Sequence, residues 1–169
     1  NKKDKKDQYF YGYFYLGLGY YNLNQFDVSC NYFAKCEEFL IDKSYFRLAY
    51  SASLFNYANQ LFIKDDVESA KKLFYKSTTL NNEAYPSYFQ LGVIYLFEND
   101  YKNSKMVFEY LTNIFPNNIS IKVSLWYIYN NLNEVEKFEK LLVDLKKDGI
   151  LPNLGDYEFK KILAYTLFR

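Results

Sequence analysis

The 169-residue chain contains no histidine, two cysteines, three prolines and six glycines. Without histidine it lacks the commonest general base, the usual zinc ligand and the side chain that changes charge near neutral pH. Scarce proline and glycine leave little material for the many turns of an all-β protein. If Cys30 and Cys36 lie on one helix, about 9 Å separates them along its axis. That spacing is too long for a disulfide, so the cysteines do not make a disulfide framework.

Charge and short motifs narrow the function further. Lysine and arginine number 21 and aspartate and glutamate 20, so no net field attracts nucleic acid or an anionic membrane. The chain has no Gly-rich phosphate loop, no Cys-x-x-Cys pair and no serine in a nucleophile elbow. Adjacent carboxylates such as Glu37 and Glu38 point about 100° apart on a helix and do not converge on a substrate. The sequence predicts a protein that is not an enzyme, with no catalytic residue, metal site or cofactor.

Aromatic residues are abundant: the chain has 20 tyrosines and 16 phenylalanines. They crowd the uncharged stretch YFYGYFYLGLGYYNLNQF, from Tyr9 to Phe26. A membrane-spanning helix needs about 20 apolar residues, and the run from Phe10 to Leu23 is shorter and rich in tyrosine. A surface that stacks nucleic-acid bases needs lysine or arginine beside it, and none is present. We therefore expect neither a membrane span nor a nucleic-acid partner.

One motif recurs along the chain. Its clearest copy comprises Leu91, Gly92, Tyr95, Ser104, Phe108 and Pro116. The first copy comprises Leu16, Gly17, Tyr20, Ser29 and Phe33, with the same internal offsets. Steps of 34 residues from Gly92 lead back to Ala58 and forward to Trp126. The step from Gly17 to Ala58 is 41, and we assign the seven extra residues to Ser44–Tyr50, at the start of a helix.

This pattern resembles the tetratricopeptide repeat (TPR), in which Leu-Gly-x-x-Tyr lies on a first helix and a small residue and Phe on a second. The resemblance implies an all-α, TPR-like, right-handed α-solenoid of about four helix pairs with a C-terminal capping helix. It covers a single domain over 9–169, after a charged lead-in at 1–8. The pairs fall at about 10–43, 51–84, 85–118 and 119–152, and the capping helix at about 156–168. The fourth copy is degenerate, because Trp126 and Phe138 replace small residues.

Local signals support the same helices. Apolar residues recur at the helical spacing of three and four in VESAKKLFYKSTTL and VEKFEKLLVDLKK. Asp65 or Asp66, Asp100 and Asn118 stand where N-caps are expected. A glycine in the first helix lets the neighbouring helix approach closely, because it has no Cβ. We therefore expect Gly17 and Gly92 to lie at helix contacts.

In TPR arrays the first helices line a concave groove, and the resemblance places the partner there. The implied groove residues are Tyr11, Phe14, Leu18, Tyr21, Phe55, Asn59, Phe62, Phe89, Val93, Leu96 and Tyr127, together with Val123 and Asn130. This surface is aromatic and almost uncharged, which favours an apolar or amphipathic segment of another protein. TPRs that hold a C-terminal carboxylate need Lys, Arg and Asn on this face, and only Asn59 fits.

Two other readings stay open. The chain could fill its own groove with its last helix or with residues upstream of Asn1, or associate with a second copy of itself. The stretch Leu145–Leu163 also resembles a junction between pentatricopeptide repeats, which bind RNA, but only one such junction occurs. The chain does not begin with Met, which is typical of a trimmed chain or of one that has lost a leader, so the compartment is open.

Overall fold

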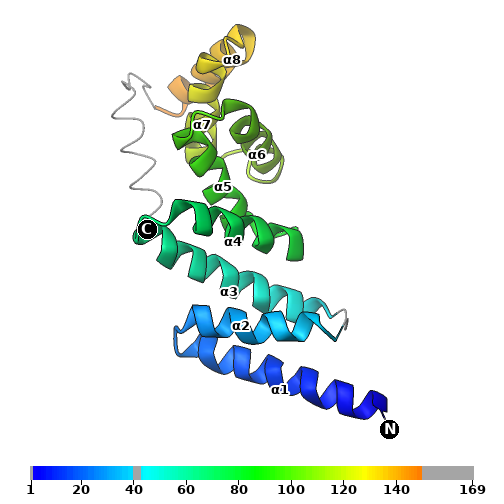
Figure 1. Ribbon diagram of the computed structural model, residues 1–169. Helices are drawn as coiled ribbons and strands as arrows, with labels where there is room; N and C mark the ends of the chain where they lie inside the picture. The colour runs from blue at the N-terminus through cyan, green and yellow to red at the C-terminus, as the bar shows by residue number, and fades with distance from the viewer. Residues whose placement is uncertain (1, 40–42, 150–169) are drawn as a thin grey trace. The chain divides into compact units, whose positions relative to one another are not determined.

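The computed structural model describes residues 2–39 and 43–149, and these residues form eight α-helices and no strand. The helices are α1 (Lys2–Asn22), α2 (Phe26–Glu37), α3 (Ser44–Ile63), α4 (Val67–Leu80), α5 (Tyr85–Phe97), α6 (Tyr101–Ile114), α7 (Ile119–Asn131) and α8 (Val135–Lys147). Odd-numbered helices are each followed by an antiparallel partner (Figure 1). The chain divides into two compact units at Ser87. The first holds α1 to α4 and the start of α5, and the second holds the rest of α5 and α6 to α8.

The two helices of each pair are joined by the same turn. Each turn has one residue in the left-handed region, with φ between 55° and 67°: Asn24, Asp65, Asn99 and Asn133. In the second pair, Asp66 N donates to Leu61 O and Asp65 N donates to Phe62 O, both at 3.0 Å. Equivalent bonds close the other three turns, which is the Schellman pattern of a helix C-terminus. Asn and Asp tolerate this backbone conformation better than other residues with a Cβ.

Side-chain caps start three of the helices. The carboxylate or amide oxygen of Asp66, Asp100 and Asn118 accepts a hydrogen bond from the backbone N–H three residues later, at 3.1 to 3.2 Å. These bonds satisfy N–H groups that have no partner inside the helix. The predicted N-caps are confirmed, and Asp65 holds the left-handed turn instead.

Glycine permits the close contact inside the first and third pairs. A Cβ added to Gly17 would lie 2.7 Å from the ring of Phe33, and one added to Gly92 would lie 2.9 Å from the ring of Phe108. Both rings are fully buried. The hydroxyl of the small residue on the second helix donates to the glycine carbonyl, at 2.8 Å for Ser29 and 2.7 Å for Ser104. The predicted helix contacts at both glycines are confirmed.

The second and fourth pairs use other side chains at this contact. In the second pair Ala58 and Ala70 are both fully buried. In the fourth, the ring of Trp126 stacks on that of Phe138, with centroids 5.5 Å apart and planes 29° apart. An aromatic stack thus replaces the contact of small residues that the other pairs use.

Buried serines connect successive helices of the first unit, and we call them the serine row. The Ser53 hydroxyl on α3 donates to the Ser29 hydroxyl on α2, at 2.9 Å. The Ser77 hydroxyl on α4 lies 2.9 Å from that of Ser51 on α3 and 2.8 Å from that of Ser87 in α5. All five residues are at most 3% exposed. Small side chains with satisfied hydroxyls therefore let these helices pack closely without leaving polar atoms bare.

The helix starts differ between pairs. α1 begins at Lys2, so the charged lead-in belongs to this helix. α3 begins at Ser44 and is 20 residues long, compared with 13 for α5 and for α7, so the seven extra residues belong to α3. The predicted capping helix at 156–168 and the last residues of the fourth predicted repeat lie outside the described residues.

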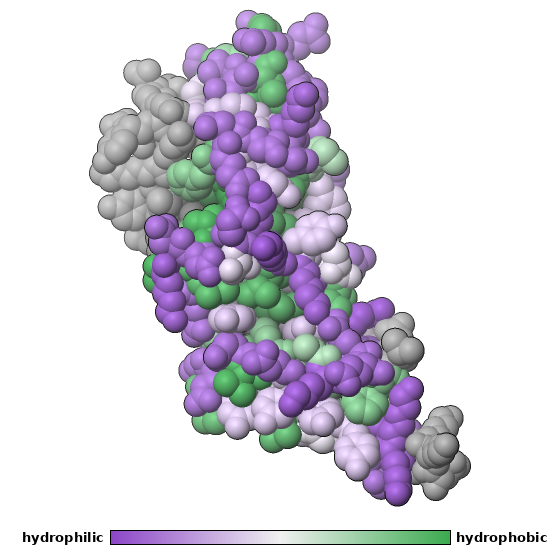
Figure 2. Space-filling view, viewed as in Figure 1, coloured by the Kyte–Doolittle hydropathy of each residue, from purple (hydrophilic) through white to green (hydrophobic). Residues whose placement is uncertain are grey.

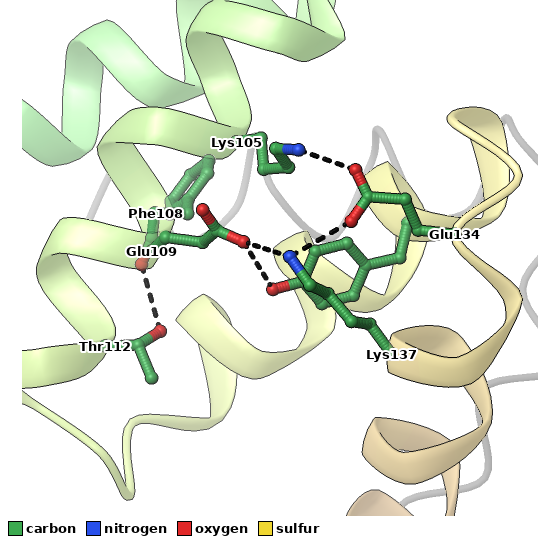
Figure 3. Close-up of polar contacts among 7 residues, drawn as sticks. Lys105, Phe108, Glu109, Thr112, Glu134 and Lys137 are labelled. Carbon is green, nitrogen blue, oxygen red and sulfur yellow. Dashed lines mark hydrogen bonds and ion pairs between the residues drawn. The ribbon is translucent and has the colours of Figure 1, made fainter.

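An ionic cluster joins α6, α7 and α8 in the second unit (Figure 3). Lys137 Nζ on α8 lies 2.9 Å from Glu109 Oε1 and 3.1 Å from Glu134 Oε2, and Lys105 pairs with Glu134. The Tyr129 hydroxyl donates to Glu109, at 3.1 Å. Burial raises the pKa of Tyr129 to about 12, and the hydrogen bond from Lys105 lowers the pKa of Glu134.

We expect Gly17→Ala to lower the free energy of unfolding by about 1–3 kcal/mol, because the added methyl overlaps the buried ring of Phe33. Gly12→Ala is the matched control on the same helix, since nothing lies within 4 Å of its added Cβ. The Gly12→Ala substitution should raise the free energy of unfolding by up to about 1 kcal/mol, because alanine has a higher helix propensity than glycine. Urea unfolding of dilute protein, followed by circular dichroism, measures both. Equal effects of the two substitutions would contradict the close contact.

We expect Lys137→Met to lower the free energy of unfolding at pH 7 by less than about 1 kcal/mol, because the lysine side chain is half-exposed. Glu134 has a lowered pKa in the folded state, so its stabilisation is present above the ordinary value of 4.5 and is lost as pH falls below it. The difference from wild type should therefore vanish at acidic pH. Denaturant titrations at neutral and acidic pH test this, with Lys140→Met on α8 as control. A pH-independent difference would refute the ionic origin.

Candidate functional site

Seven of the predicted groove residues lie on α1 and α3 in the first unit: Tyr11, Phe14, Leu18, Tyr21, Phe55, Asn59 and Phe62. Those of α1 lie against α3. Asn56 Nδ2 donates to the Tyr21 hydroxyl at 3.2 Å, and the ring of Phe14 packs edge-on against that of Tyr45, with centroids 5.2 Å apart. We call the surface that these seven residues share the α1–α3 face. Over α1 to α4, Figure 2 shows hydrophobic residues in separate patches between hydrophilic ones.

A lysine sits at one end of the α1–α3 face. Lys43, just before α3, donates from Nζ to the Tyr11 hydroxyl. Its Nζ also lies 4.8 Å from the ring centroid of Tyr11 and 5.6 Å from that of Tyr45, so both rings hold the cation. The hydrogen bond from Lys43 lowers the pKa of Tyr11. This end of the face is therefore polar and positive, whereas the rest is apolar.

Three of the predicted phenylalanines repeat one contact. Each packs on the fully buried phenylalanine of its own second helix. The ring-centroid distances are 5.9 Å for Phe14–Phe33, 5.9 Å for Phe55–Phe74 and 5.5 Å for Phe89–Phe108. One side of each ring is therefore buried in the core, and only the rest of the ring surface is available to contact a partner. Phe14 is 7% exposed, whereas Phe55 and Phe89 are half-buried.

A pocket of about 200 Å³ lies beside Phe55, and we call it the Phe55 pocket. Its lining comprises Leu48, Ser51, Ala52, Phe55, Ser77, Asn81, Glu83, Ala84, Pro86 and Ser87. A second hollow, of about 480 Å³, adjoins it, because both share Leu48, Asn81 and Glu83. The second hollow is more polar and includes Arg47. Together they form an apolar recess with a polar rim.

The residues that complete this recess were not among the predicted site residues. Leu48 is 59% exposed, and Ala52 and Pro86 line the pocket with it. Ala52 and Leu48 lie three and seven residues before Phe55, which places all three on one side of the helix. The helical period of the sequence could therefore have indicated Ala52 and Leu48 as site residues. Leu48 lies among the seven extra residues of α3. No sequence pattern indicates Pro86 as a site residue, because it lines the pocket only through tertiary packing.

In the second unit the predicted groove residues are largely enclosed. Val93, Leu96 and Tyr127 are 0%, 2% and 7% exposed, so they offer a partner little surface. Val123 is also buried, and Asn130 is exposed. The predicted site residues of the second unit are therefore mostly inaccessible to a partner. The candidate docking surface lies in the first unit, at the α1–α3 face and the Phe55 pocket.

The described residues offer little reactive chemistry. Burial raises the pKa of both Cys30 and Cys36 to about 11, so neither thiol ionises appreciably at neutral pH. Within 2–39 and 43–149, no three His, Cys, Asp or Glu side chains gather as metal ligands would. Over the same residues, no helix has both the length and the apolar character needed to cross a bilayer. Most of the stretch that resembles a pentatricopeptide junction lies outside the described part of the chain.

Comparison with known proteins identifies the type of fold. No protein-family model matches the chain, and no curated protein matches it in sequence. Among solved structures, PilF of Pseudomonas aeruginosa matches 96% of this chain and 90% of its own, with a TM-score of 0.50 and 17% identity. MamA matches 91% of this chain and 81% of its own, with a TM-score of 0.51 and 17% identity. Both are TPR-repeat proteins, so this chain has an all-α, TPR-like helical repeat fold.

Proposed function

We propose that this protein is a non-enzymatic interaction module that docks an apolar or amphipathic segment of a partner protein on the α1–α3 face. The observation that carries the proposal is the Phe55 pocket, an apolar recess of about 200 Å³ beside an exposed leucine. An anchor side chain of the partner would enter this pocket and bury the exposed surface of Leu48. The TPR-like fold supports such a role, because helical repeats present extended binding surfaces.

The energetics of such docking come from a preformed surface. Phe55 is fixed by Phe74 behind it, and the pocket wall is helical, so binding orders few protein groups. Aromatic and aliphatic side chains in a desolvated pocket supply most of the binding energy in many interfaces. Burial of apolar surface contributes about 25 cal/mol for each Å² removed from water. The surrounding polar groups then determine orientation more than affinity.

Charges on the rim favour one orientation of the bound segment. Lys43 and Arg47 lie near the start of α3, and Glu83 lines both the pocket and the polar hollow that includes Arg47. We expect the partner segment to carry an acidic residue on the side of Lys43 and its apolar anchor over Phe55. A segment with the reverse charge order should bind more weakly at low ionic strength, with the difference falling as salt is added.

A photo-crosslinking amino acid at Leu48 tests the surface directly. We expect it to link a segment of another protein, which mass spectrometry identifies and which can then be synthesised as a peptide. The same crosslinker at Tyr75, which is 61% exposed on α4 and does not line the pocket, should not link it. A product that links Leu48 only to this same chain would overturn the proposal in favour of a self-filled groove.

We expect Leu48→Glu to weaken binding of the synthesised peptide at least about tenfold, because the charge would have to be buried against apolar groups. Leu48 is 59% exposed, so the fold should be retained, which circular dichroism and the unfolding midpoint verify. Tyr75→Glu, with a similarly exposed residue changed, should leave the dissociation constant unaltered. Undiminished binding by folded Leu48→Glu protein would show that the docking surface lies elsewhere.

A further inference from the structure

The accessible residues of α3 on the docking surface follow a regular spacing. Steps of four, three, four and three residues separate the members of this stripe, which we call the α3 seam: Leu48, Ala52, Phe55, Asn59 and Phe62. Leu48 is 59% exposed and the other four are half-buried. An average step of about 3.5 residues is the spacing at which two helices pack along each other. The predicted groove residues of α1 recur at steps of three and four as well: Tyr11, Phe14, Leu18 and Tyr21.

The α1–α3 face offers little to pair with the backbone of an extended segment. Asn59 is the one amide among its seven residues, since the others are aromatic or aliphatic. The nearby Asn56 already donates from Nδ2 to the Tyr21 hydroxyl and to Ala52 O. Backbone N–H and C=O groups that are buried without partners cost free energy, whereas a helix pairs its own. The form of segment that suits this face is therefore a helix.

We infer that the partner segment binds the α3 seam as an α-helix that runs antiparallel to α3. The inference rests on the proposed docking function and specifies the conformation of the bound segment. Leu48 and Phe62 are fourteen residues apart, so the seam is about 21 Å long and matches about four turns of a partner helix. Apolar side chains of the partner, spaced by three and four residues, pack between those of the seam, and one of them enters the Phe55 pocket.

Charge complementarity determines the direction of the bound helix. Lys43 and Arg47 lie at the start of α3, where Glu83 offsets part of their charge. Residues 64–66, which follow α3, are one lysine and two aspartates, so this end is negative. The C-terminal end of a helix carries partial negative charge and the N-terminal end partial positive charge. The bound helix is therefore favoured with its C-terminal end beside Lys43, where the partner's acidic residue is also expected.

Photo-crosslinking from the two ends of the seam measures the conformation of the bound segment. We expect crosslinkers at Leu48 and at Phe62, introduced one at a time, to link the same segment at residues about fourteen apart, as the rise of a helix requires. An extended segment covers the same length with about six residues. In the antiparallel direction, the residue linked from Phe62 precedes the one linked from Leu48 in the partner's sequence. A crosslinker at Tyr75, exposed on α4, is the control and should not link the segment.

The crosslinks distinguish failure of this inference from failure of the docking function. Linked residues about six apart, or linked in the reverse order, would overturn the antiparallel helix while the docking surface stands. A segment linked from Leu48 but not from Phe62 would show that it does not follow the seam, and would overturn the inference as well. Links only within this same chain would instead overturn the proposed function.

Proline substitutions in the synthesised peptide test the helix independently. Proline in the middle of a helix breaks it, so a central proline that faces away from the seam should weaken binding at least about hundredfold. Proline at the first helical position is tolerated, so this variant is the matched control and should bind like the unsubstituted peptide. Circular dichroism should show the peptide gaining helix as it binds. Equal affinities of the two proline variants would contradict a bound helix.

Discussion

The reversal of the chain within each helix pair depends on a single residue held in the left-handed region, Asn24, Asp65, Asn99 or Asn133. Two backbone hydrogen bonds close each turn, so the start of the second helix is fixed relative to the end of the first. That offset places Ser29 under the carbonyl of Gly17, and it repeats in the third pair. The offset of the second helix along the first therefore depends, in each pair, on its one left-handed turn residue.

The candidate docking surface follows from the same geometry. Because the first helix of each pair packs at a constant offset, one side of the Phe55 ring packs on the buried Phe74 and the other side faces outward. How much of that side stays accessible depends on its neighbours. In the first unit, the longer α3 adds Leu48 to the stripe, and the start of α5 adds Pro86. The irregular spacing at the start of α3 therefore contributes one wall residue, Leu48, to the recess.

Local chemistry made much of the fold predictable from the sequence. The caps at Asp66, Asp100 and Asn118 and the glycine contacts at Gly17 and Gly92 depend on residues close in sequence or at fixed offsets. Exposure was less predictable, because the period of a helix defines its sides but not what packs on them. The burial of Val93, Leu96 and Tyr127 depends on tertiary packing. The Phe55 pocket draws on α3, α4 and the start of α5, so no single segment reveals it.

The serine row has a mechanical consequence for the first unit. A hydroxyl can either donate or accept, and it rotates to suit its neighbour. When α3 shifts slightly against α2 or α4, a hydroxyl such as that of Ser53 or Ser77 can exchange one oxygen partner for another nearby and remain bonded. A close-packed hydrocarbon seam would resist the same shift by opening a void. The helices of this unit are therefore joined by contacts that are tight and that can rearrange without losing a hydrogen bond.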